Sequence, residues 1–230
     1  MSSLEPAALI ELMRLASPAL PVGGFSYSEG LETACEAGLA SDAETAQTWL
    51  LDQLQLSLAR CDLPAAAQAF EAWRAGDLPR IQALNDWVTS TRETRELLQQ
   101  SQQMARSLVD WMRRRVAQPD PLVESAASLS PAPTWPVAFA LAASRSGAPR
   151  REAMIALAAG WAENMVAAAI KAVPLGQAAA QRLLDALSRQ LPERVDAAIG
   201  LRDGERQAFA PMLAILSARH ETQYSRLFRS

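Results

Sequence analysis

The stretch AMIALAAGWAENMVAAAIKAV, Ala153 to Val173, decides how the whole chain is interpreted. It is apolar and long enough to cross a bilayer, but Glu163 and Asn164 lie at its middle. A bilayer would penalise the charge at that depth by roughly 3 kcal/mol, so we expect a helix buried in a globular core. Its many alanines would let neighbouring helices approach closely, and Trp161 and Met165 would share one face of it.

Helical periodicity extends over nearly all of the remaining chain, and the alternating β-branched runs that mark strands are missing. The sequence therefore predicts one compact all-α domain over residues 1–230, with about ten helices and no sheet. Residues 117–136 are rich in proline and are predicted to be a long connection within this domain. We expect helices over Asp42–Arg60, Leu63–Arg74, Pro79–Ser90, Arg92–Val116, Val137–Ser146, Pro149–Ala172, Leu175–Leu191 and Pro211–His220, with a short helix starting at Pro192.

Near the N-terminus, LASPALPVGGFSYSEGLETA, Leu15 to Ala34, predicts a turn between two helices. Pro18 ends the first helix, because proline disfavours helix at the preceding residue and cannot donate the next hydrogen bond. Ser26 and Glu29 fit the S-x-x-E capping box and so predict where the second helix starts. The first helix is expected to pack through one stripe, formed by Leu9, Leu12, Met13 and Ala16.

Composition restricts the classes of partner. Lys plus Arg (22) and Asp plus Glu (25) nearly balance at a net charge of −3, so no basic field favours nucleic acid or anionic lipid.

The N-terminal segment lacks a basic leader, and we therefore expect a cytoplasmic protein. Cys35 and Cys61 are too few and too unpatterned for a disulfide framework and are interpreted as two buried apolar thiols.

His220 is the single histidine, and it limits the chemistry that the chain can carry. It lies far from Cys35 and Cys61 in sequence, so no metal site is predicted within one chain. A dimer could bring two copies of His220 together across a two-fold axis; the alternative is a partly exposed, hydrogen-bonded histidine. The pair Gly23-Gly24 lacks the phosphate-loop pattern, and no cofactor is predicted.

Two further motifs contain charged residues. RETRELLQQSQQM, Arg92 to Met104, alternates charge as a solvated helix face does, with pairs such as Arg92 and Glu96. Lys171 ends an apolar run just before VPLGQ. It is either a helix C-terminal cation favoured by the helix dipole or a lysine held for a partner, and the pattern leaves both interpretations open.

The C-terminal ARHETQYSRLFRS mixes aromatic side chains with arginines, a combination enriched at interface hot spots. Residues 219–230 are therefore predicted to be a partner-docking tail. The alternative is that this tail packs onto its own domain.

Three of these stretches together resemble one family, the urease accessory protein UreF. They are LASPALPVGGFSYSEGLE near the start, RETRELLQQSQQM in the middle, and IKAVPLGQAAAQRLL followed by ARHETQYSRLFRS at the end. Their order and spacing also agree, so the resemblance spans nearly the whole chain. One departure is TWPVAFALAA, Thr134 to Ala143, where many relatives carry a histidine near the start and a glycine after the phenylalanine.

The resemblance implies an all-α protein without catalysis of its own that acts in nickel insertion into apo-urease. It implies a homodimer that binds an accessory protein of the UreD or UreH type, partly through a C-terminal segment that becomes ordered on binding, and that recruits the nickel-carrying GTPase UreG. The residues that it assigns to partner surfaces are Tyr27, Ser28, Lys171, Pro174, Gly176, Gln177, Arg219, His220, Glu221, Tyr224, Arg226, Leu227, Phe228 and Arg229. In the N-terminal turn we expect Phe25 to enter the core and Tyr27 to face a partner.

Two other functions compete with that of a pure scaffold. One is regulation of GTP hydrolysis by UreG, in a GTPase-activating or fidelity role, because an arginine or lysine supplied in trans can speed phosphoryl transfer by roughly 10³ to 10⁵. The other is a helical enzyme acting on a small molecule, which would need a pocket with convergent polar groups that the sequence does not reveal. A scaffold is favoured over both.

Overall fold

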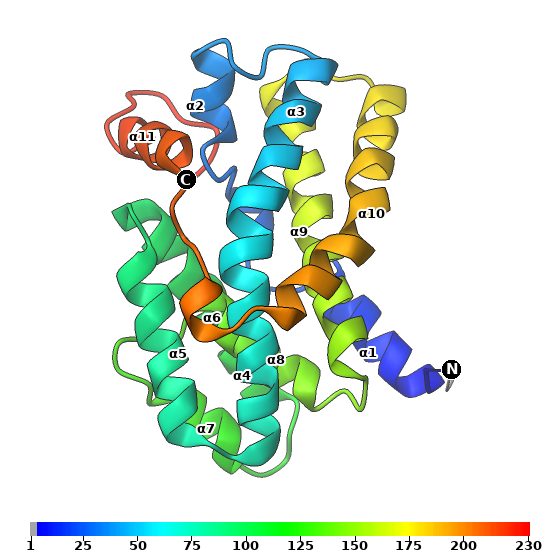
Figure 1. Cartoon of the computed structure of the whole chain (residues 1–230), viewed down its shortest axis with the longest axis vertical. Coiled ribbons are helices and arrows are strands. Elements are labelled where there is room, and N and C mark those ends of the chain that lie inside the picture. Colours follow the sequence, from blue (N-terminus) through cyan, green and yellow to red (C-terminus); the bar gives the residue numbers. More distant parts are fainter. Residues whose placement is uncertain (1–3) are drawn as a thin grey trace.

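The computed structural model describes residues 4–230, and these form a bundle of helices without a strand (Figure 1). The predicted all-α fold is thereby confirmed. The helices are α1 (Pro6–Ala16), α2 (Leu31–Glu36), α3 (Ala43–Gln53), α4 (Leu63–Ala75), α5 (Leu78–Thr91), α6 (Arg95–Arg114), α7 (Pro121–Ala127), α8 (Trp135–Ser144), α9 (Arg150–Ala172), α10 (Gln177–Gly200) and α11 (Pro211–His220), with a π-helical segment (Leu54–Asp62) joining α3 to α4.

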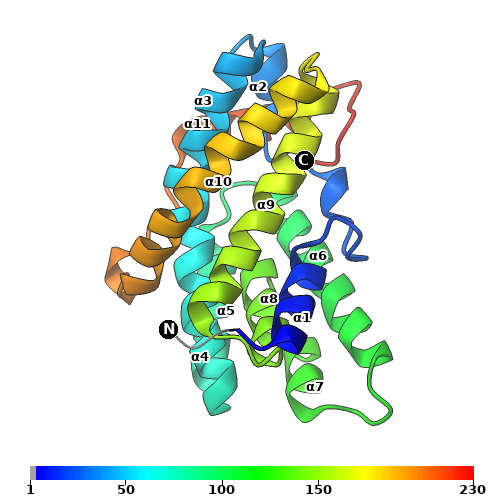
Figure 2. The same cartoon turned by 90° about the vertical axis from the view of Figure 1, so that its right-hand side faces the viewer.

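Helix α9 lies at the centre, where it packs against α1, α4, α8 and α10 (Figure 2). It is long and apolar enough to cross a membrane, yet 56% of its most apolar window is buried inside the bundle. Gly160 allows the close crossing of α1, because a Cβ atom there would lie 3.1 Å from the backbone oxygen of Ala16. The prediction of a core helix is confirmed, and its small residues bring the neighbouring helices close to it.

Helix α1 packs through a different stripe from the one expected. Ala8, Leu12 and Leu15 are buried, whereas Leu9 and Met13 are exposed. The helix is apolar on both sides, so periodicity alone did not identify its inner face.

Two predicted helix boundaries, one between Arg60 and Leu63 and one at Pro192, are absent from the structure. The helical chain continues from α3 through the π-helical segment into α4 although Pro64 lies there, and the carbonyl of Arg60, four residues earlier, accepts a hydrogen bond from the Gln207 N–H at 3.0 Å. Helix α10 likewise continues through Pro192 and bends (Figure 1). Leu191 and Val195 on either side of this proline are both buried, so packing holds both halves of α10 against the core.

The proline-rich stretch 117–136 is a connection only in part, because it contains α7. Asp120 caps this helix by accepting hydrogen bonds from the backbone N–H groups of Leu122 and Val123, and Pro121 occupies its first turn. Proline is tolerated there because the first N–H groups of a helix have no partner within it. The buried side chains of Val123 and Ala126 attach α7 to the bundle.

The turn before α2 differs from the predicted capping box. Gly30, with φ of 77°, is the N-cap of α2, and Ser26 makes no capping bond. Instead the Ser28 hydroxyl accepts the backbone N–H of Glu32 at 3.4 Å. Glu29 has φ of 50° and turns its carboxylate into the fold, where it cannot cap α2.

Candidate functional site

The C-terminal segment returns to the body of the protein after α11, and the C-terminus lies beside α2 in Figure 1 and beside α9 in Figure 2. Its last residues run along the N-terminal turn. The Arg229 N–H donates to the Ser26 carbonyl at 2.8 Å, and the Ser28 N–H and hydroxyl donate to the Ser230 carbonyl at 2.7 and 2.6 Å. The alternative in which the tail packs onto its own domain therefore describes the isolated chain.

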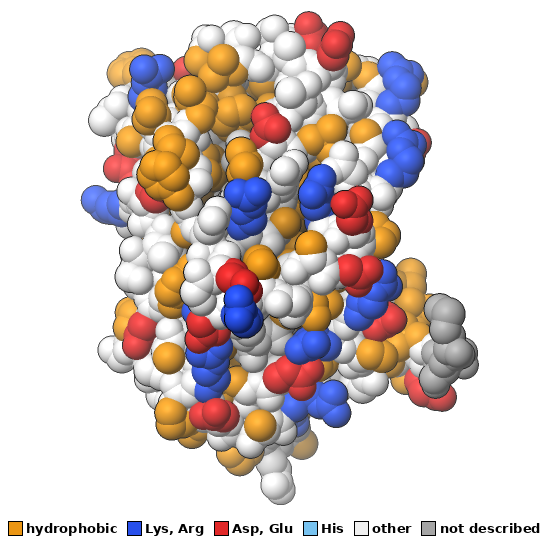
Figure 3. All heavy atoms as spheres, viewed as in Figure 1, with side chains coloured by type: hydrophobic (Ala, Val, Ile, Leu, Met, Phe, Trp, Pro, Cys, Tyr) orange, Lys and Arg blue, Asp and Glu red, His pale blue; other side chains and the backbone are white. Residues whose placement is uncertain are grey.

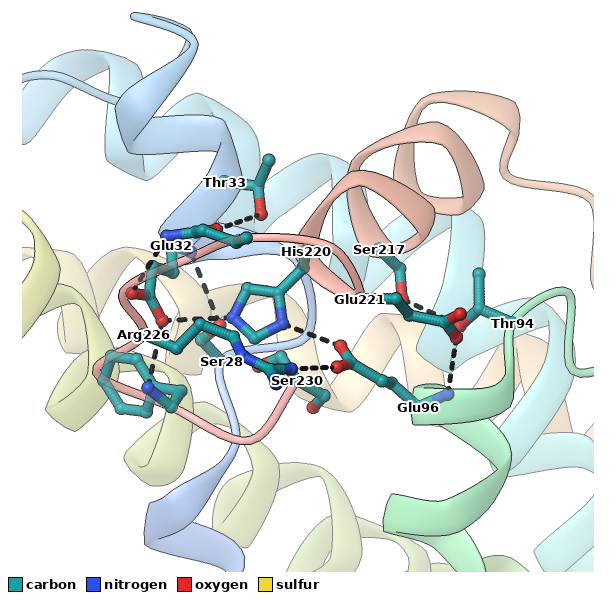
Figure 4. Close-up of polar contacts among 12 residues, drawn as sticks. Ser28, Glu32, Thr33, Thr94, Glu96, Ser217, His220, Glu221, Arg226 and Ser230 are labelled. Carbon is teal, nitrogen blue, oxygen red and sulfur yellow. Dashed lines mark hydrogen bonds and ion pairs between the residues drawn. The ribbon is translucent and has the colours of Figure 1, made fainter.

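A buried ionic cluster fixes the start of this tail (Figure 4). His220 is fully buried, with Nδ1 2.7 Å from a carboxylate oxygen of Glu96 on α6 and Nε2 3.2 Å from one of Glu32 on α2. The alternative of a partly exposed, hydrogen-bonded histidine was wrong about the exposure of His220, whereas its hydrogen bonding is confirmed. The single histidine of the chain joins α11 to two other helices, and neither of its nitrogens is available to a metal or to a second copy of His220.

Glu32 and Glu96 also hold the tail beyond His220. The two carboxylate oxygens of Glu32 accept the backbone N–H groups of Leu227 at 2.7 Å and Phe228 at 3.0 Å. Glu96 accepts a hydrogen bond from the Arg226 guanidinium at 2.6 Å. Each of the two acids thus binds both the histidine and the tail.

Sequence analysis did not identify these two acids. Glu96 was expected to pair with Arg92 on a solvated face, but Arg92 pairs with Asp62 instead. A usable signal was present: Glu96 and Gln100 precede Met104 at intervals of four residues, and all three are buried on one side of α6.

A second group of contacts holds the end of the tail. Phe228 is buried, and the Lys171 ammonium lies 5.5 Å from the centre of its ring. The Ser230 hydroxyl donates to the Gln100 side chain at 2.6 Å. Gln100 in turn donates to Glu29 at 2.7 Å, and burial raises the pKa of this carboxyl. Lys171 therefore contacts the chain's own tail in this structure.

The aromatic residues of the N-terminal turn are placed in the reverse of the expected order. Tyr27 is 6% exposed and Phe25 is 57% exposed. Gly24 lies so close to α9 that a Cβ atom would meet the Asn164 amide at 2.8 Å. The turn is pressed against α9 at that point, and after it Phe25 is exposed to solvent whereas Tyr27 and Ser28 are buried.

The remaining predicted residues divide between exposed and buried positions. Tyr224 is fully exposed and Leu227 is 70% exposed, although the backbone of Leu227 is held by Glu32. Ser28 is buried beneath the tail. The other exposed predicted residues are Pro174, Gly176, Gln177, Arg219, Glu221, Arg226 and Arg229.

This arrangement supports binding better than catalysis. Within residues 4–230 no group of three or more histidine, cysteine, aspartate or glutamate side chains is arranged to hold a metal ion. Burial raises the pKa of Cys61 to about 12 and that of the half-buried Cys35 to about 11, so both thiols stay protonated and unreactive near neutral pH. The site offers exposed apolar side chains on a backbone that the fold holds in place.

Comparison with known proteins identifies close relatives. The UreF family model matches residues 40–188. The urease accessory protein UreF of Methylibium petroleiphilum is 63% identical, over 97% of this chain and 94% of the relative. That of a Polaromonas species is 57% identical, over 100% of this chain and 97% of the relative. A bifunctional urease accessory protein UreEF of Bordetella bronchiseptica is 45% identical over 99% of this chain, which spans 53% of that longer protein.

Proposed function

Because this chain belongs to the UreF family of urease accessory proteins, we propose that it acts in urease maturation as a non-catalytic adaptor. Its role in urease maturation follows from the family. The finer role is that of a docking platform which joins other accessory proteins and changes no bond itself.

The observation that carries this proposal is the form of the tail. Tyr224 and Leu227 expose their side chains to solvent while Glu32 holds the backbone of Leu227 and Phe228. When the backbone of the tail is already fixed, binding a partner costs less conformational entropy than when binding must first order a mobile tail. The tail is therefore suited to receive an accessory protein of the UreD or UreH type.

The surface next to the tail extends this docking region. Apolar side chains gather over α11 at the upper left of Figure 3, and Phe209, Met212 and Ile215 are exposed at and just before this helix. The tail emerges directly from α11. Exposed apolar side chains followed in the chain by exposed arginines have the composition of an interface core with a polar rim.

The complete proposed assembly contains further components. The adaptor works in the cytoplasm as a homodimer, binds the UreD or UreH-type protein, recruits the GTPase UreG and acts on apo-urease, for which nickel is the cargo. The Bordetella bronchiseptica relative supports such cooperation, since its name joins two accessory proteins in one chain. No cofactor of its own is needed for this role.

The proposal is tested by co-purification with a UreD-type protein, with complex mass measured by light scattering. Changing Tyr224 and Leu227 together to serine should abolish the complex without unfolding the chain, because both side chains are exposed. Met13→Ser, which alters an equally exposed apolar residue on α1, is the matched control and should leave binding intact. Equal binding by all three proteins would refute docking through the tail.

A further inference from the structure

We propose that a cavity inside the bundle binds a small neutral amide, with Arg92 as the hydrogen-bond donor to the carbonyl oxygen of this ligand. This inference concerns the isolated chain and goes beyond the proposed adaptor role. The cavity lies between the N-terminal turn, the π-helical segment and helices α6, α8 and α9.

The size of the cavity limits the ligand. Its volume is about 70 Å³, and it is enclosed on most sides. An apolar cavity of about 150 Å³ holds benzene, which has six non-hydrogen atoms, so this cavity admits a molecule of about three or four. Ordered water is the competing occupant, since one water molecule needs only about 10–15 Å³.

One buried donor of the cavity wall has no partner in the chain. The Arg92 guanidinium pairs with Asp62 through a terminal nitrogen, whereas its Nε–H is buried and finds no acceptor within residues 4–230. A buried donor without an acceptor is strongly unfavourable. An acceptor oxygen of a ligand in the cavity would satisfy it.

The charges of the wall favour a neutral ligand. Glu29 and Asp62 line the same cavity as Arg92. A small anion would bring its charge close to two acidic side chains, and a small cation has no lone pair to accept the Arg92 Nε–H. A neutral carbonyl group meets neither obstacle.

Glu29 also offers acceptors for an N–H group of the ligand. One of its carboxylate oxygens receives the Trp161 indole N–H at 2.9 Å, and the other receives the Gln100 side-chain amide at 2.7 Å. Each carboxylate oxygen has about two acceptor positions, so each can accept one more donor. A ligand with an N–H group beside its carbonyl can therefore bind Arg92 and an acid together, and an amide has this arrangement.

Much of the remaining wall is apolar. Met104, Phe139 and Leu157 belong to it, and they come from α6, α8 and α9. Binding sites for small molecules commonly combine such a surface with a few polar groups that fix the orientation of the ligand. The apolar surface suits the methyl group of acetamide, which has four non-hydrogen atoms.

Two rare backbone geometries occur where the cavity has its polar groups. Glu29 has φ of 50°, a conformation that residues other than glycine seldom adopt. The π-helical segment contributes Ser57 and Asp62 to the wall. Strained residues and π-helical turns both concentrate at functional sites, so their coincidence here supports a binding site.

The test compares four molecules of nearly equal size, which are acetamide, acetone, acetate and acetamidinium, on the full chain. Proton–nitrogen NMR follows the indole N–H groups of the six tryptophans, of which Trp135 and Trp161 line the cavity. Acetamide should shift these two resonances in a saturable manner and leave the other four in place. The expected dissociation constant is about 1 mM, which lies within the limit for so small a ligand.

Each comparison molecule lacks one feature of the amide. Acetone has no N–H group, acetate carries a negative charge and acetamidinium has no acceptor, so each should bind at least about tenfold more weakly. Binding of any of the three as tight as that of acetamide would overturn the proposal. The absence of a saturable shift with acetamide would also overturn it, and would mean that the cavity takes water only.

Two variants assign the effect to Arg92. Arg92→Lys keeps a positive charge beside Asp62 but removes the Nε–H, so acetamide should bind at least about tenfold more weakly. Arg95→Lys alters an exposed arginine outside the cavity and should bind acetamide as the parent chain does. Full binding by Arg92→Lys, or loss of binding in Arg95→Lys, would count against the site. The four-molecule comparison on the unaltered chain remains decisive if Arg92→Lys does not fold.

Discussion

Replacing Glu96 by glutamine tests the cluster energetically. The change keeps the shape of the side chain and removes its charge. The hydrogen bond from His220 to Glu96 is short and buried, and such bonds to charged groups contribute about 1.5–3 kcal/mol. The Arg226 guanidinium is 39% exposed, so solvent screening reduces its share to about 0.2–1 kcal/mol. Glu96→Gln should therefore lower the free energy of unfolding by about 2–4 kcal/mol.

The assay is urea denaturation followed by circular dichroism at pH 6.5. An unchanged slope of the unfolding free energy against urea concentration shows that only stability has altered. Glu124→Gln is the matched control. Glu124 pairs with Arg113 at the surface, where the two side chains are 45% and 41% exposed, and its loss should cost less than about 1 kcal/mol. If Glu96→Gln destabilises the protein no more than Glu124→Gln does, the cluster does not hold the tail as argued.

Three further predictions concern the interior. Burial raises the pKa of Glu29, so the folded chain keeps a proton that the unfolded chain releases, and stability should fall as the pH rises from 5 to 7; Glu29→Gln should flatten this slope in urea denaturation. Gly160→Ala should destabilise the protein by about 1–3 kcal/mol, because the new Cβ would meet the backbone of α1. Gly200→Ala, with no atom within 4 Å of the new Cβ, should stabilise the protein slightly. Thermal unfolding of both variants measures the difference. Tyr27→Ala should cost about 3–5 kcal/mol and Phe25→Ala less than about 0.5 kcal/mol; equal losses would contradict their placement inside and outside the fold.

The helices were predictable wherever a long periodic pattern carried them. Helix α9 lies where the apolar stretch from Ala153 predicts a helix. The stretch was assigned to the core because the charge at its centre makes a membrane span unfavourable. Pro192 misled the prediction, since local rules end a helix at proline while the packing of Leu191 and Val195 keeps α10 continuous. Local propensity is a weak guide where tertiary contacts oppose it.

The site was predictable in composition but not in geometry. The aromatic and arginine residues of the tail indicated an interface. The residues that anchor the tail could not be predicted, because His220 contacts residues 124 and 188 positions away in the chain. A single sequence carries no signal that pairs residues so far apart. The same limit applies to Tyr27 and Phe25: one is buried and the other exposed, and no local pattern in the turn distinguishes them.

The claim that the tail is docked by the chain's own acids is tested most directly by hydrogen exchange of the isolated protein at pH 6.5. The backbone N–H groups of Leu227 and Phe228 donate to Glu32, so both should exchange far more slowly than in an unstructured peptide. Tyr224 lies in the exposed part of the tail and provides an internal comparison. Exchange of Leu227 and Phe228 at the rate of the unstructured peptide would contradict intramolecular docking and would mean that only a partner orders the tail.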